Sequence, residues 1–246
     1  MYYKLKYLAF TLLALIIFAV SPPLLQAQMF SIDDPEGRTE RTLGVFTMVG
    51  ASWDFADFSY TGDAATEDQR VDFNDSIFRL RLESPGINVS AGFGGSFTGM
   101  NDNSYINVDG RIFNKIALTR SDSFLLTVPI QLTTDLTQVR LNRTDAEFSQ
   151  SSLVFGTGLA GDLNLGERIS LNLQATPNYG FSFSQGSLFG GSLFRFDAKS
   201  LLFIHDVIGS RSLTLGYHFD FRRYDIDGDL NDYDFTSHSV TLGITF

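Results

Sequence analysis

The amino-acid sequence predicts an all-β protein: one closed antiparallel transmembrane β-barrel of about ten strands, with eight strands as the alternative. Three observations support this fold class. Apolar and polar residues alternate along much of the chain, and short and long connections separate the alternating segments in turn. The chain is also rich in aromatic residues, with 24 Phe, 9 Tyr and 1 Trp among 246 residues. A membrane barrel places such rings on its lipid face and in girdles at both interfaces.

The clearest alternation runs from Ile169 to Phe183. Its odd positions are apolar, aromatic or proline, and its even positions are Ser, Asn, Gln, Thr or Gly. A strand sends successive side chains to opposite faces, so this segment has one apolar and one polar face. It is much longer than the roughly five or six residues of a strand in a soluble sheet. Its length fits a tilted strand that crosses a bilayer. Segments 87–97, 213–222 and 239–246 alternate in the same way.

Ten strands are expected from this pattern, and their connections are alternately short and long. The expected strands are 42–58, 74–84, 86–98, 104–119, 123–139, 150–165, 168–183, 192–205, 211–224 and 233–246. An even number of strands, with short turns at one end and longer loops at the other, is typical of bacterial membrane barrels. Pro129 and Pro177 fall inside two of these strands and cannot donate to the ladder. A bulge or a missing hydrogen bond is therefore expected at each.

The first 27 residues have the layout of a secretory signal peptide. Lys4 and Lys6 precede an apolar run over 8–20, and small and turn-forming residues follow before Ala27, where cleavage is expected. The run is shorter than the roughly 20 residues that a membrane-spanning helix needs. The expected organisation is a signal peptide (1–27), a periplasmic N-terminal tail (28–41) and a barrel domain (42–246).

Charge and cysteine content exclude several classes of function. The formal net charge is −10, which argues against a nucleic-acid partner because phosphate binding needs a basic surface. The chain has no Cys, so it has no disulfide framework, no thiolate metal site and no cysteine lipid anchor. No cofactor is expected.

The polar face of the predicted strands consists mostly of small residues, which suit a narrow lumen better than a solvated exterior. It also carries charged residues and one histidine, which we expect inside the barrel: Arg79, Arg81, Glu83, Arg195, Asp197, Lys199, His218, Asp220 and Arg222. A turn near 208–209 places 195–199 beside 218–222. Arg195 would then reach Asp220, and Arg222 would reach Asp197, diagonally. A structural network of ion pairs is the favoured interpretation, and a selectivity filter is the alternative.

The last long loop carries a weak candidate metal site. Asp225, Asp227, Asp229 and Asp232 alternate around a glycine, a spacing that resembles the start of a Ca²⁺ loop. The bidentate Glu expected at position twelve is absent, because that position is Thr236. A solvated acidic turn is therefore the favoured interpretation. The first long loop is also expected to be acidic, through Asp54, Asp57, Asp63, Glu67, Asp68, Asp72 and Asp75.

The final strand carries Val240, Leu242, Ile244 and Phe246 at alternate positions and ends the chain on an aromatic residue. This pattern resembles the C-terminal signature of outer-membrane proteins. The resemblance implies a small bacterial outer-membrane barrel, OmpA/OmpX-like or porin-like. It also implies outer-membrane lipid around the barrel and recognition of these four residues by the barrel-assembly machinery. The fold alone assigns no activity.

The function expected from these features is non-enzymatic: a structural barrel or a narrow pore for small solutes. Lumenal Gly and Ser favour some permeability, although ten strands are too few for a general porin, which has about sixteen. One alternative is an adhesin or interaction protein that acts through its acidic outer loops. The other is a lipid-modifying enzyme, but among His205, His218 and His238 none has a clearly placed Ser nucleophile.

Overall fold

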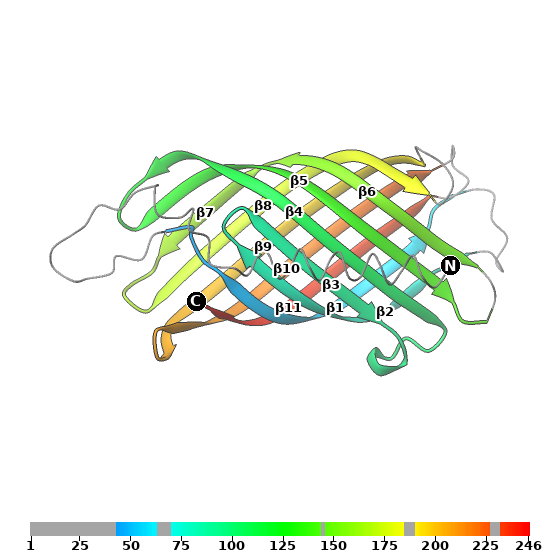
Figure 1. Cartoon of the computed structure of the whole chain (residues 1–246), viewed down its shortest axis with the longest axis horizontal. Coiled ribbons are helices and arrows are strands. Elements are labelled where there is room, and N and C mark those ends of the chain that lie inside the picture. The colour runs from blue at the N-terminus through cyan, green and yellow to red at the C-terminus, as the bar shows by residue number, and fades with distance from the viewer. Residues whose placement is uncertain (1–42, 63–69, 144–145, 185–189, 227–231) are drawn as a thin grey trace, which may run out of the picture. The chain divides into compact units, whose positions relative to one another are not determined.

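The computed structural model describes residues 43–62, 70–143, 146–184, 190–226 and 232–246, which belong to one compact unit. The predicted signal peptide and N-terminal tail lie outside the described residues. Eleven strands follow one another along the described chain (Figure 1). Their bounds are β1 Met48–Tyr60, β2 Phe73–Ser84, β3 Ile87–Gly94, β4 Asn103–Arg120, β5 Phe124–Leu141, β6 Glu147–Thr157, β7 Leu159–Asn164, β8 Ile169–Ser184, β9 Gly191–Ile208, β10 Arg211–Ile226 and β11 Tyr233–Thr245.

The strands form one closed antiparallel ring. Apart from β6 and β7, each strand pairs with its neighbours in sequence, β1 pairs with β11, and pairing of β4 with β5 completes the circle. Strands β6 and β7 occupy a single position, because both pair with β5 on one side and with β8 on the other. The ring therefore has ten positions, as the sequence predicts.

Both prolines lie where the wall is interrupted between β6 and β7. Strand β5 pairs with β6 up to Ile130–Thr157 and with β7 from Thr127–Ala160, so Pro129 lies beside the gap. Pairing with β8 also breaks there, across the segment that contains Pro177. Proline has no N–H to donate to the ladder. The expectation of an irregularity at each proline is thus confirmed, at one shared place in the wall.

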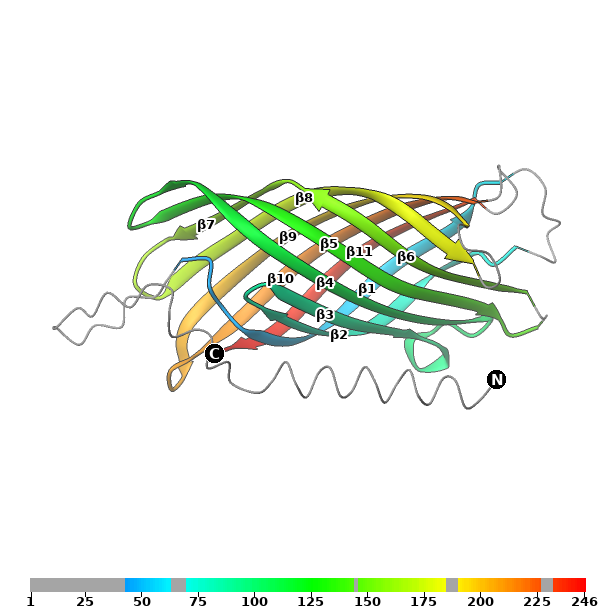
Figure 2. The same cartoon turned by 45° about the horizontal axis from the view of Figure 1, so that its top comes forward.

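The strands are staggered as well as closed. Following the paired residues once round the ring, from Met48 back to β1, ends at Tyr60, twelve residues further along. The intermediate partners are Glu83, Asn88, Arg111, Thr133, Val154, Gly180, Leu193, Tyr224 and Tyr233. A stagger of this size over ten strands inclines them by about 40° to the barrel axis. Figure 2 shows this inclination, and the stagger decides which side chains share a level inside.

The two faces of the wall are the reverse of those of a soluble protein. On β8, Asn172 and Ser182 are fully buried, whereas Tyr179 and Phe181 are 62% and 53% exposed. Polar side chains therefore fill the interior and apolar side chains face outward, as a lipid environment requires. Closure of the ring allows the backbone groups of every strand to form hydrogen bonds with neighbouring strands. This is needed because hydrocarbon offers them no partners.

The segment before β1 differs from the prediction. Residues 43–47 were expected in the first strand, but β1 begins at Met48. Gly44 adopts a left-handed φ of +76°, and a Cβ there would lie 2.8 Å from Asp162 Oδ2 of β7. Strand β7 lies opposite β1 in the ring. This segment therefore crosses the end of the barrel that holds the short turns, because its glycine allows both the turn and the close approach.

The β3–β4 connection is the other departure from the expected bounds. Strand β3 ends at Gly94 rather than at residue 98, because Ser96–Thr98 form a short 3-10 turn, η3. Within the described parts of the chain, no helix is long and apolar enough to cross a membrane.

Candidate functional site: the charged lumen

An aromatic layer closes the lumen at the end that holds the longer loops. Phe58 lies at its centre, with ring centroids 4.6 Å from Tyr233, 5.0 Å from Phe148 and 5.6 Å from Phe73. All the rings of this layer are nearly inaccessible to solvent, and they point inward from six strands. The layer comprises Phe58, Phe73, Tyr105, Phe148, Tyr224, Tyr233 and Phe235.

Arg222 lies next to this layer and begins a belt of ion pairs. Its guanidinium lies 5.2 Å from the ring centre of Phe235. Its nitrogens are 2.5 Å from Asp135 and 2.7 Å from Asp220. The predicted pair of Arg222 with Asp197 is wrong. Arg222 instead bonds to Asp220 on its own strand and reaches across the lumen to β5.

Arg195 joins three carboxylates from three strands. It lies 3.1 Å from Asp220 and 2.9 Å from Asp197, and it also bonds to Asp109 on β4. The predicted contact of Arg195 with Asp220 is confirmed. The register behind it is confirmed too, since Arg195 pairs with Arg222 and Asp197 with Asp220 between β9 and β10.

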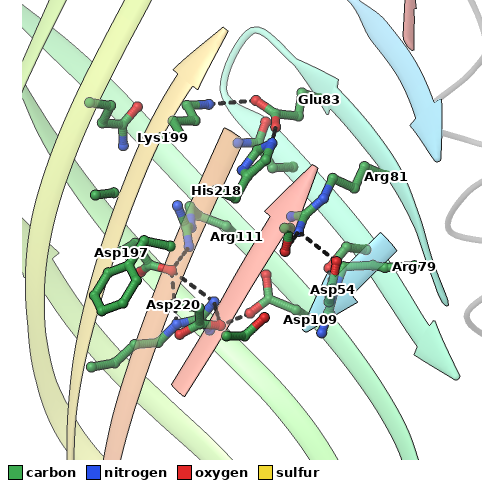
Figure 3. Close-up of a pocket in the computed structure, with 18 of the residues that line it drawn as sticks. Asp54, Arg79, Arg81, Glu83, Asp109, Arg111, Asp197, Lys199, His218 and Asp220 are labelled. Atoms are coloured by element: carbon green, nitrogen blue, oxygen red, sulfur yellow. Dashed lines mark hydrogen bonds and ion pairs between the residues drawn. The ribbon is translucent and has the colours of Figure 1, made fainter. Parts of the chain in front are cut away.

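Three further ion pairs continue the belt toward the end with the short turns. Asp54 on β1 binds Arg79 at 2.6 Å. Arg111 on β4 binds Asp197 at 3.0 Å, and Lys199 on β9 binds Glu83 on β2. Figure 3 shows Lys199 directed at Glu83 and Arg111 directed at Asp197. Six strands, β1, β2, β4, β5, β9 and β10, thus contribute charges to this belt.

A smaller apolar group lies at the end with the short turns. Met48, Leu201 and Phe203 are buried there. The ring of Phe46, from the segment that crosses this end, lies 4.8 Å from the ring of Phe203. The ion pairs therefore lie between an aromatic layer and a second apolar group.

One cavity remains within the charged belt. It offers about 60 Å³ to water-sized molecules, which is room for about five waters. Arg81, Asn88, Arg111 and His218 are among the side chains that line it. The small lumenal residues leave space beside their own strand, as the sequence suggests. The side chains of arginines and aromatic residues from other strands lie in that space.

The charges of residues 43–246 divide into three groups. The lumen holds seven acidic and seven basic residues: Asp54, Glu83, Asp109, Asp135, Asp162, Asp197 and Asp220 with Arg79, Arg81, Arg111, Lys115, Arg195, Lys199 and Arg222. The turns at one end hold three of each sign: Asp122, Glu167 and Asp206 with Arg120, Arg168 and Arg211. By sequence, the long connections and their flanks (57–75, 95–104, 140–149, 185–190 and 223–234) hold fourteen acidic and four basic residues. The net negative charge of residues 43–246 thus comes from the long connections and their flanks, because the acidic and basic residues of the lumen and of the turns are equal in number.

The structure brings all nine predicted lumenal residues inside the barrel. It adds Asp54, Asp109, Arg111 and Asp135, which sequence analysis missed as partners. Asp54 was assigned to an acidic loop, but its side chain is 1% exposed and lies within β1. Their inward direction could have been predicted from the sequence, because each of the four lies in the polar phase of its strand. Apart from Asp54, whose partner Arg79 lies on the adjacent strand β2, they pair with residues on strands that are distant in sequence.

The candidate metal site is only partly described. Asp227 and Asp229 of the candidate metal site are outside the described residues. Asp232 Oδ1 accepts a hydrogen bond from the backbone N–H of Ile226, so this carboxylate caps the hairpin. Asp225 is exposed and accepts a 3.4 Å hydrogen bond from Ser192. Among described residues, no group of three or more potential metal ligands occurs.

The C-terminal residues form one outward row. Val240, Leu242 and Phe246 are 62%, 58% and 61% exposed, and Ile244 continues the row. Arg211 lies 4.9 Å from the ring centre of Phe246. His238 is also outward, and its Nδ1 lies 2.7 Å from the hydroxyl of Tyr217.

A closed ring of ten tilted antiparallel strands, apolar outside and polar within, is the architecture of small bacterial outer-membrane barrels. The alternation of short turns and longer loops agrees with it. The chain therefore has the fold of a small outer-membrane β-barrel.

Comparison with known proteins adds to this at the level of the fold alone. No protein-family model and no curated protein matches the chain. Among solved structures, the translocator domain of the autotransporter NalP from Neisseria meningitidis is 11% identical, covers 82% of this chain and 88% of its own, and has a TM-score of 0.39. The outer membrane protease OmpT from Escherichia coli is 9% identical, with 84% and 98% covered and a TM-score of 0.39. Ail, the attachment invasion locus protein of Yersinia pestis, is 10% identical, with 82% and 99% covered and a TM-score of 0.27.

Proposed function

We propose that this protein is a non-enzymatic, non-conducting barrel with a structural role in the outer membrane. The observation that carries the proposal is the filled lumen. An aromatic layer, a belt of ion pairs and a second apolar group follow one another along the barrel interior. The cavity that remains, at about 60 Å³, holds a few waters rather than a solute. Of the two roles expected from the sequence, the structural one is favoured over the narrow pore.

Single-channel recording in a planar bilayer tests this proposal. The purified, refolded barrel should show no conductance steps above those of bilayer and detergent alone. Insertion has to be verified in the same preparation, and the single tryptophan provides the probe. Trp53 is 40% exposed on the outward face, so its emission should shift to the blue when lipid replaces water around it. Steady conductance from verified, inserted barrels would overturn the proposal in favour of a narrow pore.

The arrangement around His205 supports a non-enzymatic role. Its Nε2 lies 2.8 Å from Ser170 Oγ, which is the geometry of a nucleophile and base. Its Nδ1 lies 2.8 Å from Ser212 Oγ, however, whereas a catalytic triad has a carboxylate at that nitrogen. Expression with mass analysis of the membrane lipids is the test, and a shift in lipid mass that depends on His205 would overturn the proposal.

We further propose that the chain is exported by residues 1–27 and assembled through its last strand. The outward row that ends in Phe246 offers an apolar edge on which the barrel-assembly machinery could act. Phe246→Ser should reduce the folded barrel in outer-membrane fractions severalfold, while refolding of the purified protein into detergent stays unchanged. Equal losses in both assays would assign Phe246 to stability instead.

A surface-interaction role is the second candidate, favoured by the charge distribution. The loop end carries fourteen acidic and four basic residues, while the lumen and the turn end are balanced. Such a face favours cationic partners and disfavours anionic ones. Binding of whole cells to a cationic surface should fall when residues 63–69 are deleted, and unchanged binding would exclude this loop.

A further inference from the structure

The lumenal cavity has an uneven supply of hydrogen-bond partners. Three buried polar atoms have none among the described residues: Arg111 Nε, His218 Nε2 and Asn88 Oδ1. All three belong to side chains that line the same cavity. His218 is only 8% exposed, so its ring does not form hydrogen bonds with bulk solvent. Buried polar groups are normally paired, and a gathering of three unpaired ones around a cavity indicates an occupant.

The lining of the cavity holds as many carboxylates as cationic side chains: Asp54, Glu83, Asp109, Asp197 and Asp220 with Arg79, Arg81, Arg111, Arg195 and Lys199. The four charges that act most strongly on His218 are nevertheless cationic, those of Arg81, Lys199, Arg111 and Arg79. Glu83 also lies close, with Oε1 3.9 Å from His218 Nε2, and Lys199 already binds its other oxygen.

Arg81 in particular lacks a carboxylate of its own. It donates to the hydroxyls of Ser52 at 3.1 Å and Ser239 at 3.3 Å. Its nearest carboxylate oxygen is on Asp54 at 3.8 Å, and that residue binds Arg79 at 2.6 Å. The Arg81 charge is therefore only partly compensated by the protein.

We propose that this cavity binds one small monovalent inorganic anion of chloride size, held by Arg81, Arg111 and His218. A guanidinium donates and never accepts, so Arg111 Nε requires an acceptor. Nε2 of His218 donates in one neutral tautomer as well as in the charged form. The Asn88 amide becomes a further donor when it is turned by 180°, which exchanges its oxygen and nitrogen.

The other occupants fit less well. A cation would face Arg81, Arg111 and Lys199 at close range, and like charges repel strongly where water is scarce. A phosphate ester or a larger organic acid needs more room than the few waters that this cavity holds. Water fits and is the competing occupant, but it leaves Arg81 without a close anionic partner.

Bromide separates the anion from water, because it replaces chloride and scatters anomalously. Crystals of the intact barrel soaked in sodium bromide should show an anomalous peak in contact with Arg111 Nε and His218 Nε2. A cavity that holds only ordinary water density, with no anomalous peak, would overturn the proposal. The inference does not depend on whether the barrel conducts.

A matched pair of variants tests the same site in solution. Asn88→Asp puts a carboxylate into the cavity, whereas Asn114→Asp makes the same change on an exposed residue of β4. Replacing gluconate by chloride at constant ionic strength should raise the Tm of the wild type and of N114D by a few degrees, but not that of N88D. An equal rise in all three proteins would overturn the proposal. If N88D does not fold, the bromide peak in the wild type decides alone.

Discussion

Arg222→Met provides the most direct test of the ion-pair belt. Arg222 is 1% exposed in its side chain, and Asp135, its closest partner, is 2% exposed. Methionine fills similar space without charge, so Asp135 is left as a buried carboxylate with only uncharged partners, Thr137, Ser152 and Asn107. Asp220 keeps Arg195 at 3.1 Å and is not left alone. Breaking one buried ion pair costs about 3–5 kcal/mol, and that is the expected loss in the free energy of unfolding.

Two companion variants separate the ion pair from simple loss of an arginine. Arg223→Met changes the adjacent residue, which is 64% exposed and pairs with Asp234 at 3.3 Å, so its expected cost is below about 1 kcal/mol. The double variant R222M/D135N leaves no unpaired carboxylate at Asp135. It should recover about 2 kcal/mol of the loss in R222M.

Equilibrium unfolding in urea is followed by Trp53 fluorescence in barrels refolded into detergent. It is measured for the wild type, R222M, R223M, D135N and the double variant. The refuting results are specific. If R222M costs no more than R223M, the belt does not stabilise the fold. If the double variant is as unstable as the sum of the single ones, Arg222 and Asp135 are not coupled.

Two further predictions concern the wall and the aromatic layer. Gly158→Ala places a Cβ 2.0 Å from the Ala175 carbonyl oxygen and should prevent stable folding, whereas Gly110→Ala meets its nearest atom at 3.6 Å and should be tolerated. Comparing unboiled and boiled samples on SDS gels measures the folded fraction, and a normal G158A barrel would refute the close approach. Phe58→Ala removes the central ring of the aromatic layer and should cost about 3–5 kcal/mol in unfolding free energy. It should not produce conductance in a planar bilayer, because the belt of ion pairs still fills the lumen. Open channels in F58A would show that the aromatic layer alone blocks the pore.

Much of the wall could be predicted because its cause is local. Alternation along 169–183 places Asn178 and Tyr179 on opposite faces, whatever the neighbouring strands are. The short turn after Ile208 sets the register of β9 against β10, and the predicted contact of Arg195 with Asp220 follows from it. The irregularity at each proline could likewise be predicted, because a residue without an N–H cannot donate to the ladder of hydrogen bonds.

The inward aromatic layer shows where local patterns fail. Tyr224 lies near the end of a strand, where the sequence predicts an outward aromatic girdle, yet it is 1% exposed and lies in the lumen. Aromatic residues occur on both faces near the loop end, so residue type alone does not identify the face there. The strand phase does, and Tyr224 shares the phase of Arg222.

The sequence by itself therefore determined the class of fold and the two faces of most strands, because a period of two is a property of a single strand. Only the tertiary structure decided which charges meet inside. Asp109 contacts Arg195, and Asp135 contacts Arg222, across 86 and 87 residues of chain. The reason is the twelve-residue stagger of the closed ring, which brings strands that are far apart in sequence to the same level and so selects the partners in the lumen.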